Sequence, residues 1–200
     1  MKIHFIRHQK TQWNEQGRIQ GNLNSELLND KENIALKTAN YLEENNVKDV
    51  YFSPLKRCTD TLKLICEHYK IENQKSDDRL MELNHGFFEG KFLSDLSQEE
   101  IKEKNKDPWF WKWPGGESYY QLSLRIKDFK KFLDDFEKSN NIAIISHEGV
   151  IKVFIKELLD LDNIKFGDLK VPNNVIYSLD NRSINFITLS DVRNLILSKF

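Results

Sequence analysis

Five side chains in this sequence have the types that acid–base and anion chemistry need, and each follows an apolar run that is expected to be a strand. They are Arg7, His8, Arg57, Glu82 and His147. In an open α/β sheet, ligand sites form in the crevice at the carboxyl ends of the strands. We therefore expect these two guanidinium groups, two imidazoles and one carboxylic acid to lie close together.

This set of side chains suits a dianionic phosphate group. Arg7 and Arg57 can each present paired N–H donors to phosphate oxygens, a geometry that favours arginine over lysine. A helix is expected to begin after Pro54, and its N-terminus would add partial positive charge at the same edge of the sheet. The residues themselves thus point to a phosphate site.

The composition is that of a globular protein without an excess of either charge. The chain has 200 residues, of which 39% are hydrophobic, and a formal net charge of -1. Proteins that bind nucleic acid usually carry a clear basic excess, so this balance argues against nucleic acid as a partner. No apolar run approaches the roughly 20 residues of a membrane helix. We expect a soluble cytoplasmic protein that contacts neither nucleic acid nor membrane.

Short apolar runs alternate with longer stretches of helical periodicity. Strands are expected at residues 2–7, 49–53, 78–83 and 141–146, and a closing hairpin at 174–180 and 183–189. Helices are expected at about 27–46, 54–69, 116–139 and 150–161, with Ser53 as a cap of the second. This alternation predicts a layered α/β fold with a largely parallel sheet. No linker divides the chain, so we interpret residues 1–200 as a single domain.

Several ordered segments resemble the histidine phosphatase superfamily, also called the phosphoglycerate mutase-like family. They are RHQKTQWN (7–14), GRIQG (17–21), SPLKRCTDT (53–61), MELNHGFFEG (81–90), PGGES (114–118) and SHEGVIK (146–152). The first resembles the family's Arg-His-Gly-x-Thr signature, and the last its second-histidine segment. The resemblance implies a three-layer α/β/α sandwich of the phosphoglycerate mutase-like type, with an inserted lid-like segment at about 84–117.

The resemblance also implies a role for each of the five side chains. His8 would attack the phosphorus and become a phosphohistidine. Glu82 would protonate the leaving oxygen and then activate water. Arg7, Arg57 and His147 would hold the phosphoryl oxygens and stabilise the charge that develops during transfer. No metal or other cofactor is expected, since the arginines and imidazoles supply the positive charge.

Further residues are implied on the substrate side of the pocket. They are Asn14, Arg18, Gln20, Gly21 and Glu148. Glu89 is an alternative to Glu82 as the acid, but the expected place of Glu82 at a strand end favours Glu82. His85, in the same segment, is expected either to be structural or to face the substrate.

Two positions depart from the family pattern. Gln9 stands where the family has a glycine after its nucleophile, and glycine there permits close approach of the backbone and unusual dihedral angles. We expect the Gln9 side chain to project into or over the pocket, where it would alter the substrate that fits or abolish activity. Glu148 stands where glycine is frequent, and its carboxylate is expected to weaken binding of highly charged substrates.

Residues 106–121 contain three Trp, one Phe and two Tyr around a Pro-Gly-Gly turn. They form either an aromatic clamp against the core or a lid whose rings contact the non-phosphate part of the substrate. The predicted activity is metal-independent hydrolysis of a small phosphorylated metabolite, with an α-ribazole phosphatase-like substrate as one candidate. Two alternatives stay open: a phosphoglycerate mutase, and a non-catalytic member that binds a phosphorylated ligand. Whether the chain forms a homodimer is also left open.

Overall fold

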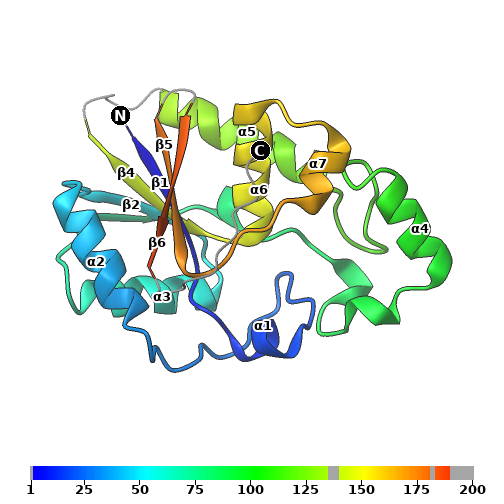
Figure 1. Cartoon of the computed structure of the whole chain (residues 1–200), viewed down its shortest axis with the longest axis horizontal. Coiled ribbons are helices and arrows are strands. Elements are labelled where there is room, and N and C mark those ends of the chain that lie inside the picture. Colours follow the sequence, from blue (N-terminus) through cyan, green and yellow to red (C-terminus); the bar gives the residue numbers. More distant parts are fainter. Residues whose placement is uncertain (1, 135–139, 181–182, 190–200) are drawn as a thin grey trace.

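A six-stranded sheet forms the centre of the computed structural model, which describes residues 2–134, 140–180 and 183–189 (Figure 1). Its strands are β1 (Ile3–Arg7), β2 (Asp49–Phe52), β3 (Asn73–Ser76), β4 (Ile142–Ser146), β5 (Val175–Asp180) and β6 (Ser183–Thr188). Their order is β3-β2-β4-β1-β5-β6, with β1 to β4 parallel and β5 and β6 antiparallel. The largely parallel sheet is confirmed, as is the closing hairpin, whose turn at 181–182 lies outside the described residues.

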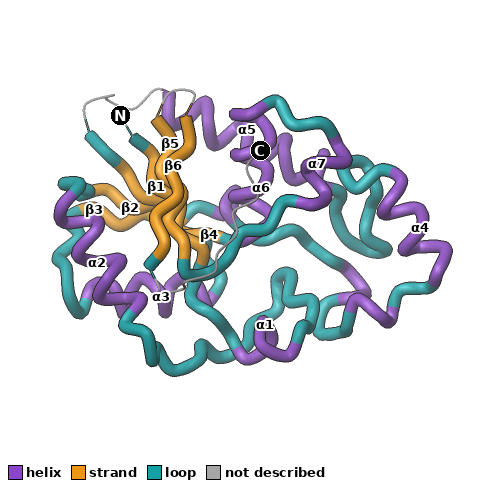
Figure 2. The backbone as a smooth tube through the Cα atoms, viewed as in Figure 1, coloured by secondary structure: helices purple, strands orange, loops and turns teal. Residues whose placement is uncertain are grey.

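Helices cover the sheet, and short helices also lie within the long connections that follow β1 and β3. The α-helices are α1 (Gln12–Gln16), α2 (Ile34–Glu44), α3 (Lys56–Cys66), α4 (Gln98–Lys106), α5 (Tyr119–Asp134), α6 (Glu148–Leu159) and α7 (Asn163–Asp168). Short 3-10 helices lie at Asp78–Leu80, Gly86–Phe88 and Leu93–Asp95. Figure 2 shows that much of the chain between β1 and α2, and between β3 and α5, is loop.

Helices α2 and α3 cover one face of the sheet, whereas α5 and α6 cover the other (Figure 1). Successive residues of a strand point to opposite faces. Phe5 of β1 therefore packs against Phe154 of α6, and Ile6 packs in the cluster formed with α2 and α3. All five residues of β4 are buried, as expected for a strand covered on both faces. The three-layer sandwich is thus confirmed.

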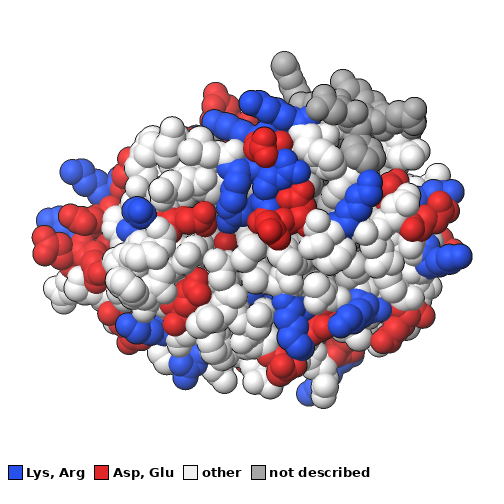
Figure 3. Space-filling view, turned by 180° about the vertical axis from the view of Figure 1, so that it is seen from behind, with Lys and Arg blue, Asp and Glu red and all other residues white. Residues whose placement is uncertain are grey.

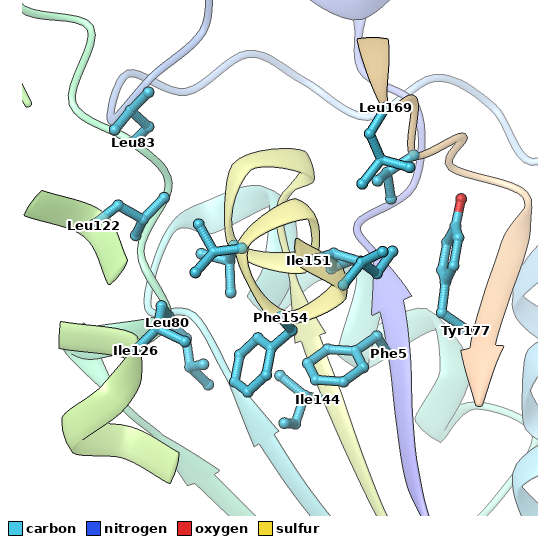
Figure 4. Packing of buried hydrophobic residues seen from close by; sticks show 14 of the residues in the cluster. Phe5, Leu80, Leu83, Leu122, Ile126, Ile144, Ile151, Phe154, Leu169 and Tyr177 are labelled. Carbon is cyan, nitrogen blue, oxygen red and sulfur yellow. The ribbon is translucent and has the colours of Figure 1, made fainter. Parts of the chain in front are cut away.

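The larger core lies between the sheet and the pair α5 and α6 (Figure 4). Leu122 and Ile126 extend into it from α5, and the rings of Phe5 and Phe154 lie 4.5 Å apart within it. Burying one such side chain contributes roughly 1.5–3 kcal/mol to folding. This core therefore fixes β1 and β4, and the residues that follow these two strands are the chemically interesting ones.

Two predicted helices begin later than the sequence indicated. Helix α2 starts at Ile34 and not at Leu27, because the Asp30 carboxylate accepts a hydrogen bond from the Ile34 N–H and fixes the first turn there. Helix α5 begins at Tyr119, and its predicted final residues, 135–139, lie outside the described residues. The local chemistry of a helix start, more than apolar periodicity, sets these limits.

The strand predicted at residues 78–83 is wrong. This segment begins with a 3-10 turn, and the strand β3 forms before it at Asn73–Ser76. The apolar residues of 78–83 are buried because the segment packs against α5, where Arg125 donates hydrogen bonds to its backbone carbonyls. All four residues of β3 are exposed, so no apolar pattern marks that edge strand.

Charged side chains of both signs share the surface. On the face seen from behind in Figure 3, Lys and Arg lie among Asp and Glu, in keeping with the net charge of -1. Every helix among the described residues is too short or too polar to cross a membrane.

Candidate active site

A cavity of about 470 Å³ collects most of the predicted site residues. Those on its wall are Arg7, His8, Asn14, Arg18, Gln20, Gly21, Arg57, Glu82 and Glu148. Arg7 and His8 reach it from the end of β1, and Glu148 from the start of α6. His147 is not on this wall, although it contacts Arg57. The sequence thus predicted residues that the fold does bring together.

His8 follows β1 directly, and the backbone carbonyl of Gln9 holds its ring through Nδ1 at 2.8 Å. A carbonyl only accepts hydrogen bonds, so Nδ1 carries the proton and the free lone pair lies on Nε2. His8 is buried, and this burial, followed by the charges of Arg57 and Arg7, lowers its pKa well below the usual value. The result is a neutral imidazole with one nucleophilic nitrogen.

Arg57 is 1% exposed and is fixed by hydrogen bonds in three directions. Its Nε donates to Nδ1 of His147 at 3.1 Å, and its terminal nitrogens donate to the carbonyls of Gly21 at 2.6 Å and Leu23 at 2.8 Å. A guanidinium group has five N–H donors. Two donors therefore remain for an anion in the cavity that Arg57 lines.

His147 follows β4 and is fully buried beside Arg57. Its Nε2 lies 2.7 Å from the hydroxyl oxygen of Ser53, and its ring centroid lies 5.3 Å from that of His8. Ser53 was expected to cap α3, but Leu55 occupies the cap position and has no side-chain cap bond. Burial and the charge of Arg57 lower the pKa of His147 well below its usual value. A direct contact between His147 and phosphate stays a prediction.

Glu82 lies in the loop after β3 and not at a strand end, so the strand-end position for which it was preferred over Glu89 is wrong. Glu82 does line the cavity, as the sequence predicted. Its Oε1 accepts from the backbone N–H of Leu83 at 2.8 Å and of Gly149 at 3.1 Å. A Cβ at Gly149 would lie 2.4 Å from that oxygen, so the approach requires glycine. Burial is the main cause that raises the pKa of Glu82. Its protonated form therefore persists to higher pH than that of an exposed carboxyl.

Arg7 and Glu148 form an ion pair on the cavity wall. The Nη1 atom of Arg7 lies 2.9 Å from Oε2 of Glu148 and also donates to the carbonyl of Val171 at 2.5 Å. The Nε of Arg7 is buried without a hydrogen-bond partner among the described residues. Arg7 thus keeps one buried N–H without a partner in the described part of the chain, while a carboxylate and a backbone carbonyl occupy Nη1.

Asn14 and Arg18 lie on the outer wall of the cavity, and contacts with other residues hold both side chains in place. Asn14 forms a reciprocal capping box with Thr11 at the start of α1. The guanidinium of Arg18 donates to the carbonyl of Gly90 at 2.8 Å and lies 4.5 Å from the centroid of the Phe92 ring. Both residues therefore tie the loop after β1 into a defined rim.

The expectation that the Gln9 side chain enters this cavity is wrong. Its Nε2 donates to the carboxylate of Asp30 at 3.0 Å, and its backbone N–H donates to the hydroxyl of Thr61 at 2.9 Å. Gln9 lines a different pocket, of about 490 Å³, and is absent from the wall of the 470 Å³ cavity that His8 lines. We call the latter the catalytic cavity, after the role proposed for it below. Its backbone does not adopt a positive φ, so this position does not require the freedom of glycine.

Part of the wall consists of residues that were not predicted from the sequence. Leu93, Tyr119 and Lys170 also line the cavity, together with His85, for which two interpretations were left open. Burial lowers the pKa of His85 to about 4, so it is a neutral ring at physiological pH. Tyr119 belongs to the aromatic segment that the sequence singled out, whereas no pattern distinguishes Lys170 or Leu93 from surface residues.

Cationic side chains outnumber carboxylates on the wall. Arg7, Arg18, Arg57 and Lys170 face only Glu82 and Glu148. In the part of the chain that the structure describes, no group of three or more His, Cys, Asp or Glu side chains is placed to hold a metal ion. The arrangement offers an anion fixed N–H donors, a neutral imidazole and a carboxyl group whose pKa is raised.

The fold is that of the phosphoglycerate mutase-like class. The mycobacterial glucosyl-3-phosphoglycerate phosphatase superposes with a TM-score of 0.79 at 23% identity, covering 94% of this chain and 96% of that one. The alpha-ribazole phosphatase from Shigella flexneri gives a TM-score of 0.76 at 23% identity, covering 95% and 96%. At such identities the likeness establishes the fold.

The chain belongs to the histidine phosphatase superfamily (branch 1), whose sequence profile matches residues 3–189. It is 28% identical over 200 residues to Phosphoserine phosphatase 1 of Hydrogenobacter thermophilus. That alignment covers 98% of this chain and 90% of the relative. The family inferred from the sequence motifs is confirmed.

Proposed function

We propose that this protein is a phosphomonoester hydrolase that acts on a small phosphorylated metabolite through a phosphohistidine at His8 and needs no metal. The observation that carries the proposal is the state of His8: Nδ1 is bound to the Gln9 carbonyl, Nε2 keeps its lone pair, and Arg7 and Arg57 line the same cavity. A neutral nucleophile beside two fixed guanidinium groups is what an attack on a phosphate dianion requires.

In the first step, Nε2 of His8 forms a bond to phosphorus while the bond from phosphorus to the alcohol oxygen breaks. The leaving oxygen takes the proton of Glu82, whose raised pKa favours the protonated form that this step needs. In the second step, Glu82 as carboxylate accepts a proton from water, whose oxygen attacks phosphorus. The bond between phosphorus and Nε2 then breaks, and His8 and Glu82 return to their starting states.

Arg7 and Arg57 act on the transferred group. Positioned donors that face developing charge in a site shielded from water are often the largest contribution to catalysis. Arg57 is held by His147, so the proposed part of His147 is to keep the guanidinium in register as well as to contact phosphate. Each donor is fixed before substrate arrives, so little reorganisation is needed during transfer.

The names of the similar proteins support a small metabolite as substrate. They are phosphatases named for phosphoserine, α-ribazole phosphate and glucosyl-3-phosphoglycerate. The non-catalytic alternative rested on Gln9, and its side chain lies outside the catalytic cavity. Hydrolysis is therefore favoured over a purely binding role.

We also propose that residues 84–117 form a lid within a single domain, since His85 and Leu93 of this segment lie on the cavity wall. A cytoplasmic location is proposed as well, because Cys58 and Cys66 are both free thiols and reducing compartments keep thiols in this state.

The test is hydrolysis of p-nitrophenyl phosphate in excess EDTA by wild type and by His8→Ala, with His68→Ala as the matched surface control. Wild type and His68→Ala are expected to turn over alike, and His8→Ala to lose roughly 10⁴-fold or more. Protein quenched in alkali during turnover should carry one phosphoryl group on a peptide that contains His8. Activity that EDTA abolishes, or that His8→Ala retains, would refute the proposal.

A further inference from the structure

A second pocket, of about 280 Å³, adjoins the catalytic cavity and is lined by basic and aromatic side chains. We call it the lysine pocket, and its principal lining residues are Lys104, Trp111, Trp113, Tyr119 and Lys152. Lys104 comes from α4 and Lys152 from α6, while the aromatic residues come from the segment before α5 and from its first turn. Three separate parts of the chain thus converge on this pocket.

Lys152 is 6% exposed, yet no carboxylate among the described residues pairs with it. Its Nζ donates to the carbonyl of Gly167 at 3.4 Å and lies 4.8 Å from the centroid of the Phe166 ring. Glu148, one helical turn earlier on α6, pairs with Arg7 instead. Burial lowers the pKa of Lys152 to about 8, so the amine still carries its charge at neutral pH.

The lysine pocket and the catalytic cavity share a wall. Tyr119 lines both, and Lys170 lines the catalytic cavity while its charge acts on Lys104 and Lys152. Lys170, Lys104 and Lys152 therefore lie on the two cavities that meet at Tyr119, beside the place where the leaving group of a phosphate ester at His8 would lie.

The charges of the pocket are unbalanced. Its acidic lining residue is Asp168, which is exposed and forms no ion pair with Lys104 or Lys152. The charges of Glu148 and Glu82 act on Lys152 from a distance and only partly offset its desolvation. Holding an ammonium group in a desolvated place without a direct ion pair is costly, and an anionic ligand in contact with it would relieve that cost. The rings of Trp111 and Trp113 would at the same time exclude water from the contact and strengthen it.

We propose that the lysine pocket is the subsite for the leaving group, and that the substrates are phosphomonoesters whose alcohol part carries a second anionic group, a carboxylate or a phosphate. Lys152 is the specificity residue of this subsite, with Lys104 opposite it. The inference rests on the proposed phosphatase activity and goes beyond it by naming the chemical class of substrate.

The test compares esters that differ only in the second charge. 3-Phosphoglycerate is paired with glycerol 3-phosphate, and propane-1,3-diol bisphosphate with the monophosphate of the same diol. In wild type, kcat/KM for the charged member of at least one pair should exceed that of its neutral partner by about 10- to 100-fold, the value of a charge-assisted hydrogen bond. The pair with the larger ratio identifies carboxylate or phosphate as the second group.

Lys152→Met should reduce this ratio by tenfold or more, since methionine keeps the volume and removes the charge. Lys156→Met is the matched control: Lys156 lies one turn along α6 and contacts the ring of Trp109 at 4.8 Å, but it lines neither pocket. It should leave the ratio within about twofold. Melting temperatures of both variants check that the fold survives.

Ratios near one for both pairs in wild type would overturn the inference and leave the phosphatase proposal intact. A high ratio that Lys152→Met does not lower would overturn the assignment to this pocket. If no ester, including p-nitrophenyl phosphate, is hydrolysed, the proposed function fails. Calorimetric titration of 3-phosphoglycerate and glycerol 3-phosphate then decides the subsite, with tighter binding of the first supporting it and equal binding refuting it.

Discussion

Two cavities of similar size are lined by residues that are neighbours in the sequence, His8 and Gln9. The catalytic cavity, of about 470 Å³, contains the side chain of His8, and the pocket of about 490 Å³ contains that of Gln9. The first holds Arg57 and Glu82, both nearly inaccessible to solvent. The second is lined largely by charged and amide residues of the loop before α2 and by 172–174, and Gln9 there is already paired with Asp30.

The difference between them shows that volume alone does not make a site. In the catalytic cavity, burial shifts the pKa of His8 downward and that of Glu82 upward, which prepares a base-like and an acid-like group for opposite tasks. The ionisable residues that line the Gln9 pocket are exposed or half-buried; they are Lys10, Glu15, Asp30, Lys31 and Glu32. Of these two cavities, only the catalytic cavity has ionisable side chains that the fold buries away from water.

The largest effect is expected from Arg57→Lys, which keeps the charge of the catalytic cavity but not its geometry. One ammonium cannot bond His147 and the carbonyls of Gly21 and Leu23 while facing phosphate. We expect kcat/KM to fall roughly 10³-fold and the free energy of unfolding to fall by about 1–3 kcal/mol. Arg79→Lys, outside the cavity, should leave activity unchanged. Near-normal activity of Arg57→Lys would show that the guanidinium does not hold the phosphoryl group.

Glu82→Gln should remove the acid while keeping the shape of the cavity. Hydrolysis of an alkyl phosphate should slow about 10²- to 10³-fold. p-Nitrophenyl phosphate, whose leaving group needs little protonation, should slow about tenfold or less by the same reasoning. Glu89→Gln tests the alternative acid and should give equal losses for both esters. The reverse pattern would show that Glu89, and not Glu82, is the general acid.

The pH dependence of kcat/KM should show both shifted groups of the catalytic cavity. His8 attacks only when neutral, and because its pKa is lowered, the acidic decline should begin well below pH 6.5. Glu82 acts when protonated, and because its pKa is raised, the basic decline should lie above pH 4.5. Activity should therefore peak between the two, and Glu82→Gln should abolish the basic decline. A basic decline that persists in Glu82→Gln belongs to another group.

The smallest effect is expected from Gln9→Gly, in the second pocket. The substitution restores the family residue, yet Gln9 does not line the catalytic cavity. We expect kcat/KM to stay within about threefold, and the free energy of unfolding to fall by about 1 kcal/mol through the lost bond to Asp30 and the added backbone freedom. Thermal denaturation and steady-state kinetics measure both. A tenfold gain in activity would mean that Gln9 does restrict the catalytic cavity.

The sequence predicted most of the sheet because burial leaves an apolar pattern. β4, buried at every position, was located within one residue, whereas β3, exposed at every position, left no pattern and was missed. The apolar residues at 78–83 are buried under α5 without pairing in the sheet, so their hydrophobicity was misread as a strand.

The site residues were predicted well where a motif fixes them and poorly where contacts decide. Arg7, His8 and Arg57 follow from motif and strand end alike. The direction of the Gln9 side chain depends on Asp30, which lies 21 positions along the chain, and no local pattern encodes that contact. The place of Lys170 on the wall likewise depends on how the segment after α7 packs.

The ion pair between Arg7 and Glu148 places a carboxylate where the proposed mechanism places a phosphoryl group. Under the proposed mechanism, a phosphoryl group at Nη1 of Arg7 would compete with this carboxylate, which lies 2.9 Å from that nitrogen. This competition would lower the affinity for inorganic phosphate, the product of the proposed reaction. Lower affinity shortens the time for which the product stays bound. The Glu148 carboxylate, expected from the sequence to weaken substrate binding, would thus also speed product release.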